Sequence, residues 1–157
     1  MSEKRQVLFL CTGNSARSQM AEGLVNHFLG DDWQAHSAGT QPTGYVHALA
    51  IEAMAELGID ISAHRSKPVI ECERTSPDLV VTLCDDAAEN CPLWLGSGRR
   101  VHLGFPDPAQ ATGSREERLE AFRQVRDAIR ERVLGLLAGW PESSAGEEIA
   151  APPRLAG

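Results

Sequence analysis

The sequence predicts an α/β fold: a single domain in which a four-stranded parallel sheet carries helices on both faces. Short apolar runs typical of buried strands alternate along the chain with amphipathic helical segments, an order that favours a parallel sheet. The chain of 157 residues is long enough for one domain with a substantial core. Because the sequence from residue 139 onward is rich in Pro, Gly, Ala, Ser and Glu, we expect a domain over residues 1–138 and a disordered tail over 139–157.

The first half of the chain contains two strand–helix units. An uninterrupted apolar run predicts the first strand at residues 7–10. Residues 18–29 carry apolar side chains at helical spacing and are followed by a glycine, which predicts a helix and its end. Residues 33–37 predict a second strand, and residues 46–57 predict a second helix that also ends at a glycine.

The second half of the chain contains two more strands and the longest helix. Residues 67–73 fit neither a strand nor a helix pattern clearly. Residues 79–83 are apolar and β-branched, which predicts a third strand, and residues 101–103 predict a short fourth strand. Residues 115–138 place apolar side chains three and four positions apart with charges between them, which predicts a long terminal helix.

Charge and composition argue against several classes of protein. There are 22 acidic and 15 basic side chains, a formal charge of -7, which argues against a nucleic-acid or anionic-membrane surface. No apolar stretch approaches the roughly 20 residues that span a bilayer, and the chain reaches its first strand without room for a signal peptide. We therefore expect a cytoplasmic protein, in which four cysteines are more often catalytic or metal-binding than structural disulfides. We also expect a monomer, although none of these observations bears on the oligomeric state.

The segment after the first strand carries a pattern suited to binding a tetrahedral oxyanion. Cys11 and Arg17 are separated by five residues, and a helix is predicted to begin directly afterwards, with a serine as its cap. Backbone N–H groups of the loop would converge on the anion above the positive end of that helix. Arg17 supplies a planar fork for two oxygens, and Cys11 in the same field is expected to be a nucleophilic thiolate. The other residues of this cradle loop are Thr12, Gly13, Asn14, Ser15, Ala16 and Ser18.

An alternative interpretation without a chemical role is a buried cysteine at a strand end, followed by an ordinary loop with a solvated arginine. A cysteine and an arginine at this spacing would not exclude it on their own. The preceding strand, the glycine and asparagine of the turn, and the helix that follows all agree with an oxyanion-binding loop. We therefore favour the cradle.

A second pair of cysteines follows the third predicted strand. Cys84 ends that strand, so it is expected on the same sheet edge as Cys11, and Cys91 comes seven residues later. An unbroken helix would separate the Cα atoms of Cys84 and Cys91 by roughly 10 Å, whereas a disulfide tolerates no more than about 7 Å. The pair can oxidise only if the segment bends or unwinds. Each cysteine alone is more simply a buried or turn residue, but beside a thiolate site we favour a redox relay.

Asp107 is a candidate general acid. It lies in the proline-flanked sequence Phe105-Pro106-Asp107-Pro108, shortly after the fourth strand. A carboxyl beside an apolar pocket that holds an anion is expected to keep its proton and to deliver it to a leaving group. An ordinary turn aspartate before a proline explains the local sequence equally well.

The remaining cysteine and the histidines suggest no further chemistry. Cys72 has no comparable placement and is interpreted as structural. The five histidines and four cysteines lack the short paired spacings of metal sites, so no metal is predicted.

Taken together, these residues resemble the thioredoxin-coupled arsenate reductases of the low-molecular-weight protein tyrosine phosphatase-like family. The resemblance runs from about Val7 to Leu137, and the stretches that carry it are CTGNSARSQMAEG, HSAG, AIEAMAELGIDIS, DLVVTLCDDAAENCP and FPDPA. The cradle loop alone indicates only the wider phosphatase superfamily. The pair Cys84 and Cys91 indicates the reductase branch.

The resemblance implies a role for each residue around the bound anion. Cys11 would attack arsenate, while Arg17 and the loop amides would hold its oxygens. Asp107 would protonate the departing hydroxide. Ser18 and Asn14 would hold the loop and the thiolate.

The resemblance also implies a three-cysteine relay. Cys84 would attack the Cys11 sulfur of the thio-arsenate adduct and release arsenite. Cys91 would then attack Cys84, and thioredoxin would reduce the resulting disulfide. Reducing equivalents would come from this partner, with no metal or organic cofactor.

The sequence departs from this family at one ion site. Some members bind potassium beside the loop through an Asn, a Glu, a Ser and an Asp. Asn14, Glu22 and Ser37 match three of these, but Lys67 stands at the position of the Asp. We expect the Lys67 ammonium to replace the cation at the same oxygens, or to be solvated with the site simply absent, and the enzyme to be insensitive to potassium.

Three other functions compete with arsenate reduction. A tyrosine phosphatase of this fold usually has a tyrosine after its Asp-Pro, whereas Ala109 follows here and the only tyrosine is Tyr45. An arsenate transferase that uses a small thiol would leave Cys84 and Cys91 without a role. A regulator that only binds oxyanions would need no nucleophile at Cys11.

Overall fold

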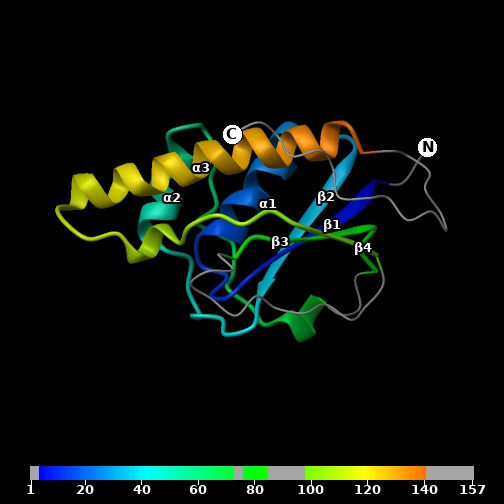
Figure 1. Cartoon of the computed structure of the whole chain (residues 1–157), viewed down its shortest axis with the longest axis horizontal. Coiled ribbons are helices and arrows are strands. Elements are labelled where there is room, and N and C mark those ends of the chain that lie inside the picture. The colour runs from blue at the N-terminus through cyan, green and yellow to red at the C-terminus, as the bar shows by residue number, and fades with distance from the viewer. Residues whose placement is uncertain (1–3, 73–75, 85–97, 141–157) are drawn as a thin grey trace.

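A computed structural model describes residues 4–72, 76–84 and 98–140 (Figure 1). These ranges contain four strands: β1 (Arg5–Cys11), β2 (Trp33–Gly39), β3 (Leu79–Thr82) and β4 (Arg99–His102). The described residues also form three α-helices: α1 (Arg17–Phe28), α2 (Ala48–Ala55) and α3 (Arg115–Ala138). Two short 3-10 helices complete the described chain: η1 (Val69–Cys72) and η2 (Pro108–Gln110).

The strands form one parallel sheet in the order β2-β1-β3-β4. The register places Cys11 opposite Gly39, and Leu10 opposite Thr82, so the carboxyl ends of the strands meet at one edge. Ligands of such sheets bind at that edge. The predicted single-domain α/β fold with a four-stranded parallel sheet is confirmed.

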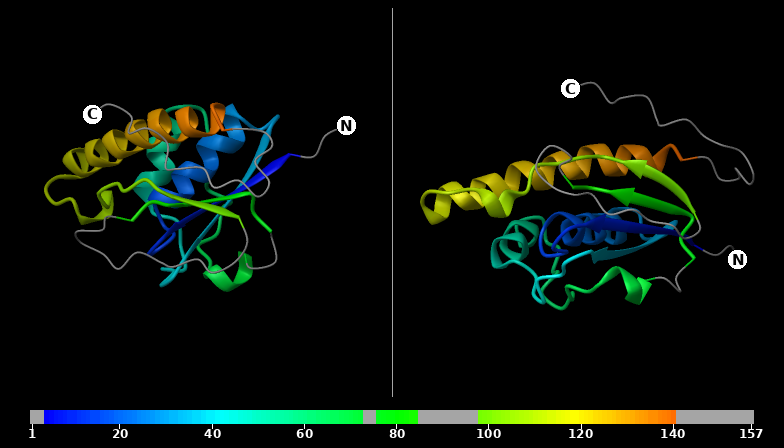
Figure 2. Two further views of the ribbon diagram at one scale, coloured as in Figure 1. Left: turned by 45° about the vertical axis from the view of Figure 1, so that its right-hand side comes forward. Right: turned by 60° about the horizontal axis from the view of Figure 1, so that its bottom comes forward.

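The two faces of the sheet are covered differently. Val7 and Phe9 of β1 join the main core, where α1 packs on β1 and β2 while α3 packs across α1 and α2. Leu8 and Leu10 point to the other face and join a smaller cluster with Cys72 of η1. Figure 2 shows α3 and η1 on opposite sides of the strands. Alternate residues of one strand are therefore buried on both faces, as its uninterrupted apolar sequence requires.

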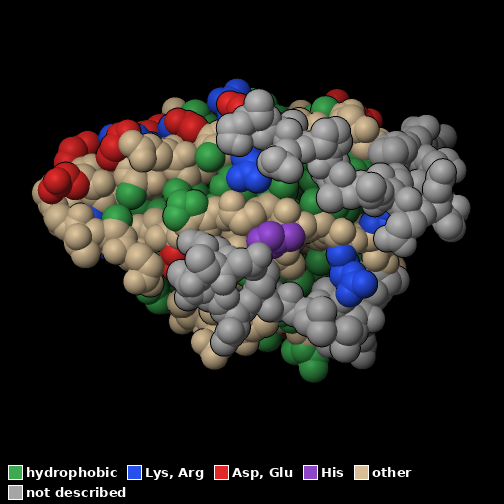
Figure 3. Space-filling model, in the orientation of Figure 1, with side chains coloured by type: hydrophobic (Ala, Val, Ile, Leu, Met, Phe, Trp, Pro, Cys, Tyr) green, Lys and Arg blue, Asp and Glu red, His purple; other side chains and the backbone are tan. Residues whose placement is uncertain are grey.

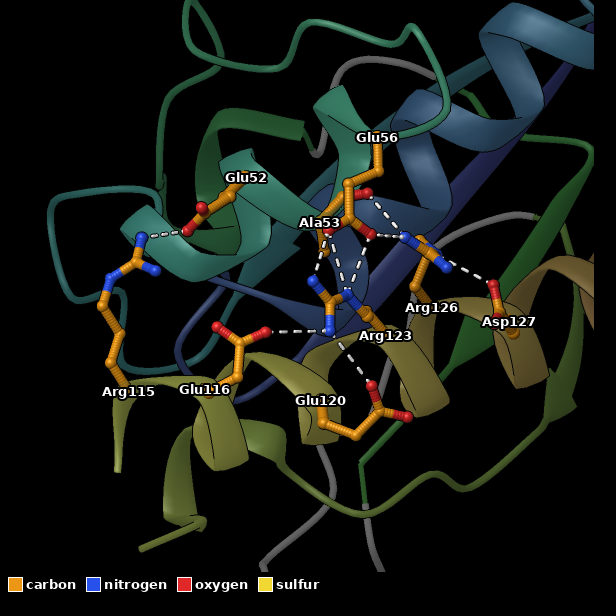
Figure 4. Close-up of polar contacts among 9 residues, drawn as sticks. All are labelled: Glu52, Ala53, Glu56, Arg115, Glu116, Glu120, Arg123, Arg126 and Asp127. Carbon is orange, nitrogen blue, oxygen red and sulfur yellow. Dashed lines mark hydrogen bonds and ion pairs between the residues drawn. The ribbon is translucent and has the colours of Figure 1, made fainter. Parts of the chain in front are cut away.

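An ion-pair network joins α2 to α3 (Figure 4). Glu56, at the end of α2, accepts hydrogen bonds from Arg123 and Arg126 of α3 at 2.8–3.0 Å. Arg126 also donates to the carbonyl of Ala53 at 2.8 Å, and it is only 7% exposed. Acidic side chains with arginines among them lie along α3 on the surface (Figure 3). These contacts fix how the end of α2 sits against the long helix.

The predicted elements agree with the observed ones except at some ends. Helix α2 is shorter than the predicted 46–57, because the His47 side chain caps it by accepting the N–H of Leu49 and the chain turns at Gly58 (φ +78°). The ambiguous segment around residue 70 is the 3-10 helix η1.

The packed region at the end of α3 extends slightly beyond the predicted boundary at residue 138. Trp140 is 9% exposed, and its carbonyl accepts a hydrogen bond from Arg5. The tail from residue 141 lies outside the described residues, so the prediction of disorder there stays a prediction. None of the helices in the described ranges is long and apolar enough to cross a membrane.

Candidate active site

The cradle loop lies between β1 and α1, at the carboxyl edge of the sheet. Gly39 of the neighbouring strand passes so close that a Cβ there would stand 2.5 Å from the carbonyl oxygen of Thr12, which only glycine permits. Asn14 adopts a left-handed conformation with φ +50°. Its side-chain oxygen accepts the N–H of Lys67 (2.8 Å), and its carbonyl accepts from Gln19 (3.0 Å). These contacts stabilise a backbone conformation that few residues other than glycine adopt.

Two donors converge on the Cys11 sulfur. The N–H of Asn14 donates to Sγ at 3.3 Å, and the Ser18 hydroxyl lies 2.9 Å away. Asn14 Nδ2 donates to the same hydroxyl oxygen at 2.7 Å, and the Ser18 O–H can donate to the sulfur when Cys11 is a thiolate. Hydrogen bonds of this kind stabilise negative charge on sulfur. Cys11 is 2% exposed, so the loop also shields it from solvent.

The serine cap expected for the first helix is wrong. Helix α1 begins after Ala16, which makes no side-chain capping hydrogen bond. Ser18 lies inside the helix instead and contacts Cys11 and Asn14. Its hydroxyl serves the nucleophile rather than the helix end.

Arg17 and Asp107 approach each other across the site. Arg17 Nη1 donates to the carbonyl of Phe105 at 3.1 Å, and its Nη2 stands 3.7 Å from Asp107 Oδ2. Arg17 is 3% exposed, whereas the Asp107 side chain is 25% exposed. The other carboxylate oxygen of Asp107 accepts the N–H of Ala109 and begins η2. Asp107 is thus fixed at both oxygens beside the guanidinium.

One cavity of about 690 Å³ brings these residues together. Its walls include Cys11, Arg17, Asp107 and the cradle loop from Thr12 to Ala16, all of them predicted from the sequence. A further set of wall residues was not predicted: Gln41, Thr43, Tyr45, His47, Pro106, Ala109 and Gln110. Residues 41–47 follow the carboxyl end of β2, which lies on the same sheet edge, and this position is the signal that could have identified them.

Tyr45 and His47 give this wall an aromatic character. Tyr45 is 58% exposed at the cavity. His47 packs against Phe122 of α3 with ring centroids 4.6 Å apart, and its backbone N–H donates to Ser15 of the cradle loop. Burial, followed by the charge of Arg118, lowers the pKa of His47, while Asp107 opposes this shift. Tyr45 therefore brings an aromatic side chain to this cavity from a loop other than the one that carries Asp107.

The structure places the other predicted cysteines as follows. Cys84 is fully buried two residues after β3, where Leu83 donates to Leu10 of β1, so it lies on the same sheet edge as Cys11. Cys84 is disulfide-bonded, whereas Cys11 and Cys72 are thiols. Cys91 and the segment between the two cysteines, which is expected to bend, lie outside the described residues.

Cys72 is buried away from the cavity, on the opposite face of the sheet. It packs against Leu8 and Leu10, and its thiol contacts the carbonyl of Ser37 at 3.8 Å. Burial raises the pKa of this thiol. These surroundings favour a protonated, unreactive side chain, in agreement with a structural role.

Asn14, Glu22 and Ser37, which match three potassium ligands of some family members, form hydrogen bonds with neighbouring groups. Asn14 is reached by the backbone N–H of Lys67, while the Lys67 ammonium donates to the carbonyl of Arg65 at 3.2 Å. Ser37 donates to Glu22 at 2.6 Å. The predicted ammonium contact with Asn14, Glu22 and Ser37 is therefore not the arrangement found, and insensitivity to potassium stays a prediction.

Within residues 4–72, 76–84 and 98–140, no three His, Cys, Asp or Glu side chains gather in a way that could hold a metal ion.

Known proteins share this fold and much of this sequence. The model of the family described as low molecular weight phosphotyrosine protein phosphatase matches residues 6–148. An arsenate reductase of Shouchella clausii is 48% identical over 130 residues, which cover 83% of this chain and 93% of the relative. A solved arsenate reductase in the phosphate binding state is 34% identical with a TM-score of 0.69, covering 85% of this chain and 97% of its own.

A thioredoxin-dependent arsenate reductase of Corynebacterium glutamicum is also similar, at 28% identity and a TM-score of 0.59. The match covers 88% of this chain and 65% of that one. The chain belongs to the low molecular weight phosphotyrosine protein phosphatase family.

Proposed function

We propose that this protein is an arsenate reductase that reduces arsenate to arsenite and is regenerated by thioredoxin. The observation that carries the proposal is the convergence of Asn14 N–H and the Ser18 hydroxyl on Cys11 Sγ, in the same cavity as Arg17 and Asp107. Such a site combines a stabilised thiolate, a cation for oxyanions and a proton donor. The similarity to arsenate reductases over most of the chain supports arsenic as the reacting centre.

The first step forms a bond between sulfur and arsenic. The Cys11 thiolate attacks As(V), and one arsenate oxygen leaves as hydroxide, which takes the proton of Asp107 and departs as water. Arg17 and the loop N–H groups hold the remaining oxygens, where negative charge is concentrated. The distance of 3.7 Å between Arg17 Nη2 and Asp107 Oδ2 supports Asp107 as the acid for an anion held by Arg17.

The second step reduces arsenic. The Cys84 thiolate attacks Cys11 Sγ, a disulfide forms, and the electron pair of the S–As bond stays on arsenic, which leaves as As(III) in arsenite. Cys91 then attacks Cys84, which returns Cys11 to a thiolate and moves the disulfide to Cys84 and Cys91. Thioredoxin, a dithiol protein of reducing compartments, reduces this disulfide, so we place the enzyme in the cytoplasm.

Two observations support this order of events. Cys84 follows β3 on the sheet edge that carries Cys11, which supports it as the cysteine that attacks the Cys11 sulfur. Cys84 carries a disulfide while Cys11 is a thiol, as expected once the disulfide has left the cradle. The scheme requires no metal or organic cofactor.

Hydrolysis of aryl phosphates is the second candidate function. Tyr45 at the cavity provides the aromatic wall that a phenyl ring would contact. Phosphate resembles arsenate, and the nucleophile, cation and acid would be shared. We expect this activity to be weak beside arsenate reduction.

The experiment that separates the two functions measures NADPH oxidation with thioredoxin and thioredoxin reductase. Arsenate added to the unaltered chain should start sustained oxidation, and arsenite should accumulate with the same stoichiometry. Omission of thioredoxin is the control. No arsenate-dependent oxidation, together with rapid hydrolysis of p-nitrophenyl phosphate, would show that the chain is a phosphatase.

A further inference from the structure

The short segment Gly104–Asp107 ends at the candidate acid and lies against the long helix α3. Arg132 of α3 contacts this segment in two ways. Its Nη1 donates to the carbonyl of Gly104 at 3.3 Å, and its guanidinium carbon lies 4.8 Å from the centre of the Phe105 ring. Phe105 is 3% exposed, so the guanidinium stacks on a ring that is buried in the core.

The same segment contacts the anion-binding Arg17 and carries the candidate acid Asp107. The carbonyl of Phe105 accepts the hydrogen bond from Arg17, and Asp107 follows two residues later at 3.7 Å from that arginine. The N–H of Phe105 donates to Leu83, the residue before Cys84. A displacement of Phe105 would therefore move the anion-binding arginine and the acid relative to each other.

We propose that Arg132 is a positioning residue, which fixes the Gly104–Asp107 segment so that Arg17 and Asp107 share one geometry around the oxyanion. Arg132 does not line the cavity, and it acts only through Phe105 and Gly104. The inference rests on the proposed roles of Arg17 and Asp107.

The chemistry of the guanidinium suits this task. Its planar face attracts the electrons of the Phe105 ring while its edge donates to a carbonyl, so one side chain fixes both a side chain and the backbone next to it. A lysine could keep a donor but not the planar stack. Because Arg132 belongs to a helix of 24 residues packed across α1 and α2, the support is rigid.

Arg130 provides a matched control on the same helix. Its guanidinium stacks on Phe28 at 4.4 Å, but Phe28 is 39% exposed, lies at the end of α1 and does not line the cavity. Arg130→Ala removes the same charge and the same type of aromatic contact. It does so at a place that supports neither Arg17 nor Asp107.

The test is a double-mutant cycle between Arg132→Ala and Asp107→Asn, with Arg130→Ala in place of Arg132→Ala as the control cycle. Arsenite release in a single turnover and hydrolysis of p-nitrophenyl phosphate are both measured. We expect Arg132→Ala to lower the rate about 10- to 100-fold, because a displacement of about 1 Å can cost this much. In the Asp107→Asn background we expect it to cost less than threefold, because no acid is left whose position relative to Arg17 could be disturbed. The rate of Arg132→Lys should lie between the rates of the unaltered chain and of Arg132→Ala.

The outcomes separate this inference from the proposed function. Equal rate losses with and without Asp107, or an Arg132→Ala rate within twofold of Arg130→Ala, would overturn the positioning role. If arsenate is not reduced but the aryl phosphate is hydrolysed, the proposed function fails while the cycle still decides the role of Arg132. If the unaltered chain neither reduces arsenate nor hydrolyses the aryl phosphate, both the proposed function and this inference are overturned.

Discussion

Arginines are used differently at the α2–α3 contact and at the cradle loop. At the α2–α3 contact, Arg123 and Arg126 meet carboxylates at hydrogen-bond distance, with Glu56 shared between them (Figure 4). In the cradle, Arg17 donates to a neutral carbonyl at 3.1 Å, and the carboxylate of Asp107 stands 3.7 Å away. The first arrangement joins two helices, with Arg126 buried and Arg123 partly exposed. The second holds a buried cation at the wall of a cavity, where it meets a backbone carbonyl and stands beside a carboxylate, which suits a site that receives an anion.

This difference predicts where substitutions change activity and where they change stability. The cradle loop contacts the Cys11 sulfur and lines the cavity, so substitutions there should mainly lower the reaction rate. The α2–α3 contacts join protein groups to one another, so substitutions there should mainly lower the free energy of unfolding. The following substitutions test this division, from the largest expected effect to the smallest.

Cys11→Ser should have the largest effect. The hydroxyl is a far weaker nucleophile than a thiolate and cannot form the S–As bond, so arsenate turnover should fall to background. Arg17 and the loop N–H groups remain, so the dissociation constant for arsenate measured by calorimetry should change only a few-fold. Cys72→Ser, at a buried thiol on the other face of the sheet, is the control and should keep turnover. Arsenate turnover by Cys11→Ser at the rate of the unaltered chain would contradict the assignment.

Asp107→Asn should lower the rate by roughly 10²- to 10⁴-fold, the range typical of a general acid. The amide is nearly the same size and can still accept the N–H of Ala109, so η2 and the cavity should keep their shape. Thermal unfolding should therefore change little. The rate loss is measured in a single turnover with the reduced protein. A loss below threefold would remove Asp107 from the proposed mechanism.

At the α2–α3 contact, Arg126→Met should reduce stability rather than rate. It removes the hydrogen bond to the Ala53 carbonyl in a place where the arginine is 7% exposed, so a cost of about 1–3 kcal/mol in unfolding free energy is expected. Arg123→Gln should cost less and lose its effect in high salt, because its partners are exposed. Urea unfolding and the single-turnover rate are measured on both. A large rate loss at unchanged stability would contradict the division.

The strength of local sequence signals explains which parts of this molecule could be predicted. The long helix α3 was predicted with its observed ends, because its apolar stripe is sustained and Ser114 and Glu117 form a capping box at its start. Cys11 and Arg17 were predicted because their spacing after the first strand suits an oxyanion-binding loop, and Asp107 was predicted from its proline-flanked sequence together with the resemblance to the family. The cavity places them together as expected.

The wall formed by residues 41–47 could not be predicted in the same way. Tyr45 and His47 belong to a loop whose sequence carries no chemical motif, and they reach the cavity only because β2 pairs with β1 in register. Arg132 is also hidden in the sequence, because its position on α3 resembles that of any exposed helical arginine. Its contact with Phe105 depends on how α3 crosses the fold.

The smallest expected effect is a loss of stability at acidic pH. Burial lowers the pKa of His36 and of His47 in the folded protein from the usual value of about 6.5. Below that pH the unfolded chain therefore binds more protons than the folded one, and the free energy of unfolding decreases as the pH falls. His47→Asn, which keeps a side-chain cap for α2, should remove part of this decrease. Urea unfolding between about pH 5 and pH 8 measures it, and an unchanged slope would contradict the assignment to His47.

The most direct test of the central claim, a nucleophilic Cys11 served by a relay through Cys84 and Cys91, is arsenate turnover by Cys91→Ser. Reduced protein is mixed with arsenate and thioredoxin, arsenite is counted per chain, and the disulfide is located by mass spectrometry. We predict repeated turnover by the unaltered chain, and a single turnover by Cys91→Ser that stops with a disulfide between Cys11 and Cys84. Sustained turnover by Cys91→Ser at the rate of the unaltered chain would contradict the relay.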